Sequence, residues 1–93
     1  MVNAVRNNVT LCRYELEVDG VTAFVTYESS PETLTLIHTE VPPQLSGRGI
    51  GSALARGVLE TVRKEGFKIL PRCEFIAGYI EKHPEFRDMV KNQ

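Results

Sequence analysis

The 93-residue sequence contains no tryptophan, only two cysteines and no excess of either charge, with 11 Lys and Arg against 12 Asp and Glu. Cys12 and Cys73 are too few for a disulfide framework, and their spacing matches no zinc-ligand pattern. The formal charge of -1 provides no basic surface to neutralise a nucleic-acid backbone. We therefore expect a reduced protein that does not bind nucleic acid, and no metal site formed by Cys73 with His38 and His83.

The sequence also lacks a long apolar run. No stretch approaches the roughly 20 consecutive apolar residues that cross a membrane, and residues 1–6 are too polar for the apolar part of a signal peptide. These absences predict a cytoplasmic protein without a membrane span. A hydrophobic content of 42% in a chain of this length predicts one globular domain over residues 1–93, which we expect to be a monomer.

The first half of the sequence alternates between apolar and polar residues, which is typical of half-buried strands. Cys12 lies at an apolar position of this alternation, so we expect its side chain in the core. Near the end of the last run, the alternation puts His38 on the same face as Leu36 and puts Thr39 on the opposite face. The pattern predicts strands over residues 10–18, 21–28 and 33–41, joined by short turns, and a less regular edge strand over residues 2–9.

The second half has the spacing of two helices around a short strand. Within residues 48–64 an apolar side chain recurs at every fourth position, which predicts an amphipathic helix that ends at Gly66. Because a helix precedes residues 67–70, we expect them to form a strand parallel to the 33–41 strand. A second helix is predicted over residues 73–82, followed by a final turn, and the whole order is that of an α+β fold. The expected buried face of the second helix carries Phe75, Ile76, Tyr79 and Ile80.

Three alternate glycines, Gly47, Gly49 and Gly51, connect the last of the early strands to the first helix. Glycines let the backbone approach a ligand closely, and the first amides of a helix have no helical partner and favour negative charge. The segment therefore predicts a site for a phosphate-bearing ligand. A tight connection without a ligand is the alternative for any glycine-rich turn.

The spacing separates the phosphate chemistries that such a loop serves. Gly51 is followed by Ser52 and Ala53, where a nucleotide P-loop has a lysine and a hydroxyl residue. The even spacing of the glycines and the short chain do not fit a dinucleotide-binding domain. A general nucleotide or phosphate ligand is left as a less favoured alternative.

The pattern Gln44-x-x-Gly47-x-Gly49, after a strand and before a helix, resembles the pyrophosphate-binding signature of the GNAT superfamily of acetyl-CoA-dependent N-acetyltransferases. Four further segments are similar to the small Yjdj-type branch of that superfamily, and the resemblance covers nearly the whole chain. These segments are His38-Thr39-Glu40-Val41-Pro42, Pro71-x-Cys73-x-Phe75, Tyr79-Ile80 and His83-Pro84-Glu85.

The resemblance implies a compact GNAT-like fold, in which an antiparallel meander is followed by a β-α-β crossover and a C-terminal helix. It also implies acetyl-CoA as substrate, bound where the 33–41 and 67–70 strands splay apart, with pantetheine extending the first strand and pyrophosphate at the glycine loop. Arg48 is expected to add a charge-assisted contact. The implied CoA-binding residues are Glu40, Val41, Pro42, Gln44, Gly47, Arg48, Gly49, Ile50, Gly51, Ser52, Cys73, Tyr79 and His83.

Cys73 is the candidate for the group that reacts. It follows Arg72 at the predicted start of a helix, where the helix dipole and the guanidinium favour a thiolate. The resemblance implies a cysteine near the thioester, and hence an acetyl-cysteine intermediate that passes its acetyl group to an amine. A small buried packing residue is the alternative.

Two further residues are acid–base candidates by resemblance. Glu40 lies at the strand end where larger GNAT enzymes have a general base, and Tyr79 is placed like the tyrosine that protonates the departing CoA thiolate. His38 is a lesser candidate that would act through water. A solvated carboxylate, a half-buried packing tyrosine and a histidine satisfied within the core are the alternatives.

The chain is shorter than a typical GNAT enzyme, and only turns are predicted where larger members carry helices over the acceptor. We therefore expect an open acceptor site, suited to a peptide or protein amine. Two hypotheses follow. One is an N-acetyltransferase that moves acetyl from CoA to an amine, and the other is a non-catalytic module that binds CoA or acyl-CoA.

Overall fold

The computed structural model describes residues 4–91, so residues 2–3 of the edge strand predicted over residues 2–9 lie outside the described residues. The element order agrees with the predicted α+β succession, apart from boundaries that differ by a few residues. The strands are β1 (Arg6–Asn8), β2 (Arg13–Val18), β3 (Val21–Ser29), β4 (Thr33–Glu40) and β5 (Lys68–Pro71). The helices are α1 (Ile50–Glu65) and α2 (Glu74–Lys82), with short 3-10 helices η1 (Pro43–Leu45) and η2 (Pro84–Met89).

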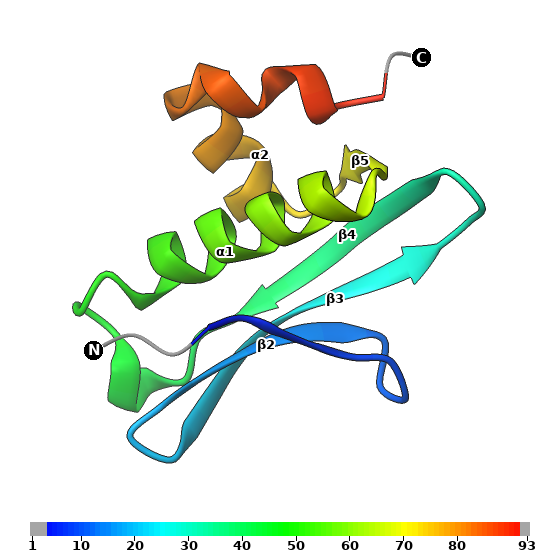
Figure 1. The fold of residues 1–93 in the computed structure, drawn as a ribbon. Helices are drawn as coiled ribbons and strands as arrows, with labels where there is room; N and C mark the ends of the chain where they lie inside the picture. The colour runs from blue at the N-terminus through cyan, green and yellow to red at the C-terminus, as the bar shows by residue number, and fades with distance from the viewer. Residues whose placement is uncertain (1–3, 92–93) are drawn as a thin grey trace.

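The five strands form one mixed sheet whose spatial order is the order of the sequence. β1 to β4 make an antiparallel meander, and β5 joins β4 in parallel after the crossover through α1. Asp19 and Gly20 form the β2–β3 turn, and both have the positive φ values, 53° and 76°, that a two-residue hairpin requires. The helices gather on one side of the sheet (Figure 1).

The core lies between the sheet and α1. Alternate side chains of β2 and β3 are buried, including Leu16 and Val25. The apolar stripe of α1 packs against them, and its residues Leu54, Val58 and Val62 are fully buried. Each such side chain stabilises the fold by roughly 1.5–3 kcal/mol relative to an exposed one, so tertiary packing holds the helix in place.

An inserted residue in β4 overturns the predicted alternation of that strand. Leu36 and His38 pair with consecutive residues of β3, so Ile37 is the extra residue of a β-bulge. Beyond the bulge the faces exchange, and Thr39, which pairs with the buried Val25, faces the core side, whereas His38 is exposed. The predicted faces of His38 and Thr39 are therefore wrong, because a strict period of two holds only in a regular ladder.

Two further side chains lie outside their predicted places in the core. β2 begins at Arg13, so Cys12 belongs to the β1–β2 turn, where it is exposed and has a φ of 54°. Phe75 is 44% exposed, because α2 buries its Ile76–Tyr79 stripe and leaves Phe75 on the flank. The Phe75 ring instead lies against α1, where a Cβ added to Gly51 would come within 2.8 Å of it.

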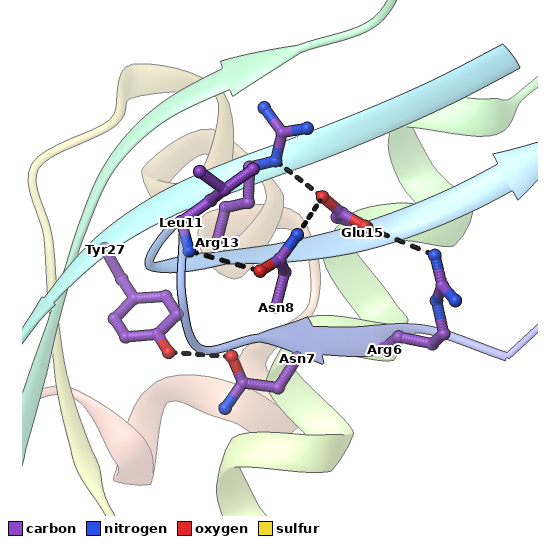
Figure 2. Close-up of polar contacts among 7 residues, drawn as sticks. All are labelled: Arg6, Asn7, Asn8, Leu11, Arg13, Glu15 and Tyr27. Carbon is purple, nitrogen blue, oxygen red and sulfur yellow. Dashed lines mark hydrogen bonds and ion pairs between the residues drawn. The ribbon is translucent and has the colours of Figure 1, made fainter.

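A buried carboxylate connects β1 and β2 on the other face of the sheet. The Glu15 side chain, 7% exposed, accepts hydrogen bonds from Arg13 Nε at 2.6 Å and Asn8 Nδ2 at 3.0 Å, and pairs with Arg6 at 3.3 Å (Figure 2). The hydrogen bonds from Arg13 and then Asn8 hold the pKa of the Glu15 carboxyl below its usual range. The Glu15 carboxylate therefore stabilises the pairing of the short edge strand β1 with β2.

Candidate functional site

The glycine-rich loop ends at Gly49, which immediately precedes α1 and has a left-handed φ of 73°. The first α1 hydrogen bond runs from the Ala53 N–H to the Gly49 carbonyl at 3.1 Å, so the amides before Ala53 have no helical partner. In the described first turn of α1 there is no acidic residue, and no side chain caps the helix start. Amides and helix dipole together fit an anion such as a pyrophosphate.

Arg48 in the same loop contacts the β2–β3 turn. Its Nη2 lies 2.9 Å from Asp19 Oδ2, and the two side chains are 47% and 69% exposed. An ion pair this exposed is screened by water and contributes little to stability. The guanidinium can therefore exchange Asp19 for a more strongly charged ligand at small cost.

The remaining predicted CoA-binding residues between β4 and α1 differ in exposure. Val41 is partly buried, and Pro42 accepts the Leu45 N–H at 2.9 Å, which forms the turn of η1. Gln44 is exposed on that turn, whereas the Ile50 side chain is buried in the core. Ile50 therefore offers only its backbone to a ligand.

A cleft of about 290 Å³ opens between the start of α1 and α2. Ser52, Tyr79 and His83, three of the predicted CoA-binding residues, line it, and Lys82 and Glu74 add one charge of each sign. Phe75 lies between this cleft and the glycine loop, since its ring also contacts Gly51. The structure thus joins the loop and the face of α2 into one continuous region.

Cys73 lies at the point where β4 and β5 part. Its N–H donates to the Leu36 carbonyl at 2.9 Å, directly after the last β4–β5 pair, Leu36 with Pro71. Among the described residues, β5 pairs with β4 no further, although β4 continues to Glu40. Cys73 is 8% exposed, and its Sγ shares a hydrogen bond with Thr39 Oγ1 at 3.0 Å.

Thr39 is a site residue that sequence reasoning missed. It reaches Cys73 because the β-bulge at Ile37 turns it toward the helices. A regular alternation would have turned it away. No signal in the local sequence marks the bulge, so only the strand register identifies this contact.

The Tyr79 phenol is held by Arg56, a second residue that the sequence did not single out. Arg56 donates from Nε to the Tyr79 hydroxyl at 3.1 Å, and from its other nitrogens to Glu60 at 3.3 Å and Glu85 at 3.1 Å. The hydrogen bond to Glu85, and then that to Tyr79, raise the pKa of Arg56. The Tyr79 ring stacks on His83 with centroids 3.9 Å apart. Because the phenol accepts from a cation, its own proton is available to another acceptor.

Glu40 pairs with His38 on the opposite face of β4 from Thr39. The distance between His38 Nε2 and Glu40 Oε1 is 3.0 Å, and the side chains are 60% and 50% exposed. The structure therefore brings Cys73 together with Thr39, and Glu40 together with His38, but separates the two pairs by the strand itself.

Residues 4–91 contain no group of three or more His, Cys, Asp or Glu side chains placed to hold a metal ion. No helix in that part of the chain is long and apolar enough to cross a membrane.

Known proteins are similar to this chain in sequence, over part of its length, and in fold. Proteins called NATD1 are similar over part of their length: that of Xenopus tropicalis is 38% identical over 53 residues, which are 57% of this chain and 49% of that protein. The Homo sapiens protein is 41% identical over 49 residues, 53% of this chain and 43% of its own. The chain thus spans about half the length of these relatives or slightly less.

A GCN5-like protein from Staphylococcus aureus, solved by NMR in solution, has the same fold. Its TM-score is 0.68 at 24% sequence identity, and the match covers 100% of this chain and 89% of that one. The profile of GCN5-related N-acetyl-transferases matches residues 13–89, a range that includes the glycine loop, Cys73 and Tyr79. The chain therefore belongs to the GCN5-related N-acetyl-transferase family.

Proposed function

We propose that this chain binds acetyl-CoA and transfers its acetyl group to an amine, with Cys73 as the first acceptor. The observation that carries the proposal is the position of the Cys73 thiol, which shares a hydrogen bond of 3.0 Å with Thr39 where β4 extends beyond its pairing with β5. An unpaired strand edge can bind an extended chain through backbone hydrogen bonds. The pantetheine arm of CoA has the amides to do so, and its thioester would lie near Cys73.

The residues around this gap fit the rest of the CoA molecule. The unpartnered amides at the start of α1 suit its pyrophosphate, and Arg48 would leave Asp19 to pair with a phosphate. The cleft beside α2 has one cation, Lys82, that could pair with a phosphate, and one carboxylate, Glu74. The backbone of residues 40–42 would then pair with pantetheine.

The proposed chemistry proceeds in two transfers. The Cys73 thiolate, stabilised by a hydrogen bond from Thr39, attacks the thioester carbonyl; the new C–S bond forms and the C–S bond to CoA breaks. Tyr79, held by Arg56, gives its proton to the departing CoA thiolate. An amine nitrogen then attacks the acetyl-cysteine carbonyl; the new C–N bond forms, the C–S bond to Cys73 breaks and restores the thiolate, and the proton that the amine loses restores the Tyr79 phenol. A direct transfer with Glu40 as base would require the amine on the opposite face, beside His38.

The competing function is a non-catalytic module that binds CoA or acyl-CoA. The burial of Cys73, which is 8% exposed, favours this alternative, because a nucleophile must reach its substrate. The partner of such a module would then recognise the acylated state of the ligand.

Incubation with acetyl-CoA, followed by intact mass and peptide mapping, separates the two functions. Transfer predicts one acetyl group on Cys73, retained in Cys12→Ala and lost in Cys73→Ala, with CoA release when an amine or lysine peptide is added. Calorimetry with CoA should give the same affinity for both variants. Tight CoA binding without acetylation or turnover would establish the non-catalytic module instead. A preference for ATP over CoA would exclude both functions.

A further inference from the structure

A second cleft lies at the other end of α1 from the glycine loop. Its volume is about 460 Å³, against 290 Å³ for the cleft beside the loop, and it falls within the roughly 300–1,000 Å³ of small-molecule sites. Because α1 has 16 residues, its two ends are about 24 Å apart. The β1–β2 turn and the end of α1 lie on the same side of the molecule, away from the loop (Figure 1).

Two largely buried tyrosine rings form the floor of this cleft. Tyr14 and Tyr27 have centroids 5.1 Å apart and planes tilted by 41°. The Tyr27 hydroxyl donates to Asn7 Oδ1 at 2.7 Å (Figure 2), and the Tyr14 hydroxyl donates to Glu65 Oε1 at 2.9 Å. Burial, above all, raises the pKa of both phenols, so they stay neutral. Both rings are therefore held in fixed orientations.

The cleft carries a negative charge that no cationic side chain of its described lining neutralises. Glu65 is the one carboxylate among the described residues that line it, and these include no Lys or Arg. Val9, which is 70% exposed, adds an apolar rim. Cys12 also lines the cleft, within the β1–β2 turn, and has a φ of 54°.

We propose that this cleft binds a small organic ammonium ion that carries an aromatic or branched aliphatic group. The ammonium would pair with the exposed Glu65 carboxylate, whereas Tyr14 and Tyr27, only 1% and 7% exposed, lie beneath it. The apolar group would cover Val9 and the partly exposed Phe67. The site is separate from the cleft at the glycine loop, so the proposal is independent of CoA binding.

The test is a titration of the full chain with phenethylamine and with the neutral phenethyl alcohol, followed by two-dimensional NMR. We expect the amine to shift amide signals at the end of α1 and in the β1–β2 turn, and to slow alkylation of Cys12 by N-ethylmaleimide. Because an exposed ion pair contributes up to about 1 kcal/mol, the affinity of the amine should exceed that of the alcohol about fivefold. The affinity of the amine should fall with added salt, whereas that of the alcohol should not. Glu65→Gln keeps an oxygen acceptor for Tyr14 and removes the charge, so it should abolish the preference for the amine. Glu81→Gln, an exposed site on α2, should leave it unchanged.

Several results would overturn the proposal. They are equal binding of amine and alcohol, an amine affinity independent of salt, shifts confined to the glycine loop, or no saturable binding by the wild-type chain. The wild-type salt series decides the matter even where Glu65→Gln does not fold. Because CoA is absent from the experiment, none of these results affects the acetyl-transfer proposal.

Discussion

Replacing Gly49 by alanine tests whether the amides at the start of α1 bind the acetyl donor. Gly49 and Gly66 flank the two ends of this helix, with left-handed φ values of 73° and 85°. A Cβ added to either glycine would meet no atom within 4 Å, so no clash distinguishes them. Each alanine substitution should therefore cost only the left-handed conformation, about 1–2 kcal/mol. For a domain of this size, each kcal/mol lowers Tm by roughly 4–8 °C.

Gly66→Ala is thus a matched control, because it carries the same strain at the end of α1 that faces away from the loop. Only Gly49→Ala should displace the amides that we propose as pyrophosphate donors. The loss of one charge-assisted hydrogen bond, about 1.5–3 kcal/mol, weakens binding tenfold or more. Calorimetry with CoA should therefore show at least a tenfold higher Kd for Gly49→Ala, and a Kd within about twofold of wild type for Gly66→Ala.

Two outcomes would refute this reasoning. If both variants melt at lower temperature and bind CoA equally well, the glycine loop is not the phosphate site. If Gly66→Ala lowers Tm and Gly49→Ala does not, the left-handed backbone at Gly49 is not what requires glycine there.

Three further predictions concern the side-chain contacts. Glu15→Gln should lower the free energy of unfolding at neutral pH by about 1–3 kcal/mol. Because the pKa of the Glu15 carboxyl is lowered in the fold, the difference in unfolding free energy from wild type should become smaller in urea titrations below about pH 4. A difference that does not change with pH would contradict this. Thr39→Val removes only the hydroxyl that is hydrogen-bonded to the Cys73 thiol, so it should slow alkylation of Cys73 by iodoacetamide about fivefold, whereas Thr39→Ser should keep the wild-type rate. Equal rates in all three proteins would exclude a role of the Thr39 hydroxyl in activating the thiol. Arg56→Gln should slow acetyl transfer about tenfold and leave the Kd for CoA unchanged, and a parallel loss of CoA binding would show that Arg56 serves the cleft and does not position Tyr79.

Local patterns were enough to predict most of the fold. The alternation of the first strands, the four-residue repeat of α1 and the terminating Gly66 each depend on near neighbours, and all three agree with the structure. The parallel placement of β5 follows from the helix between it and β4, and it is confirmed as well. The β-bulge at Ile37 could not be predicted, because it depends on how β4 is registered against β3.

The candidate site divides in the same way. The glycine spacing and the position of Cys73 before a helix are local features, and the sequence located both. The exposure of Cys12 and Phe75 could not be predicted from the sequence, because the boundary of a turn and the exposed side of a helix depend on which distant residues pack there.

The sequence by itself determined the order of elements, the position of the glycine-rich loop before α1 and the thiol at the start of α2. The tertiary structure alone decided which side chains surround that thiol and the Tyr79 phenol. Thr39 meets Cys73 across 34 positions of sequence, and Arg56 meets Glu85 across 29. Such contacts depend on strand register and helix packing between distant segments, and no local periodicity carries that information.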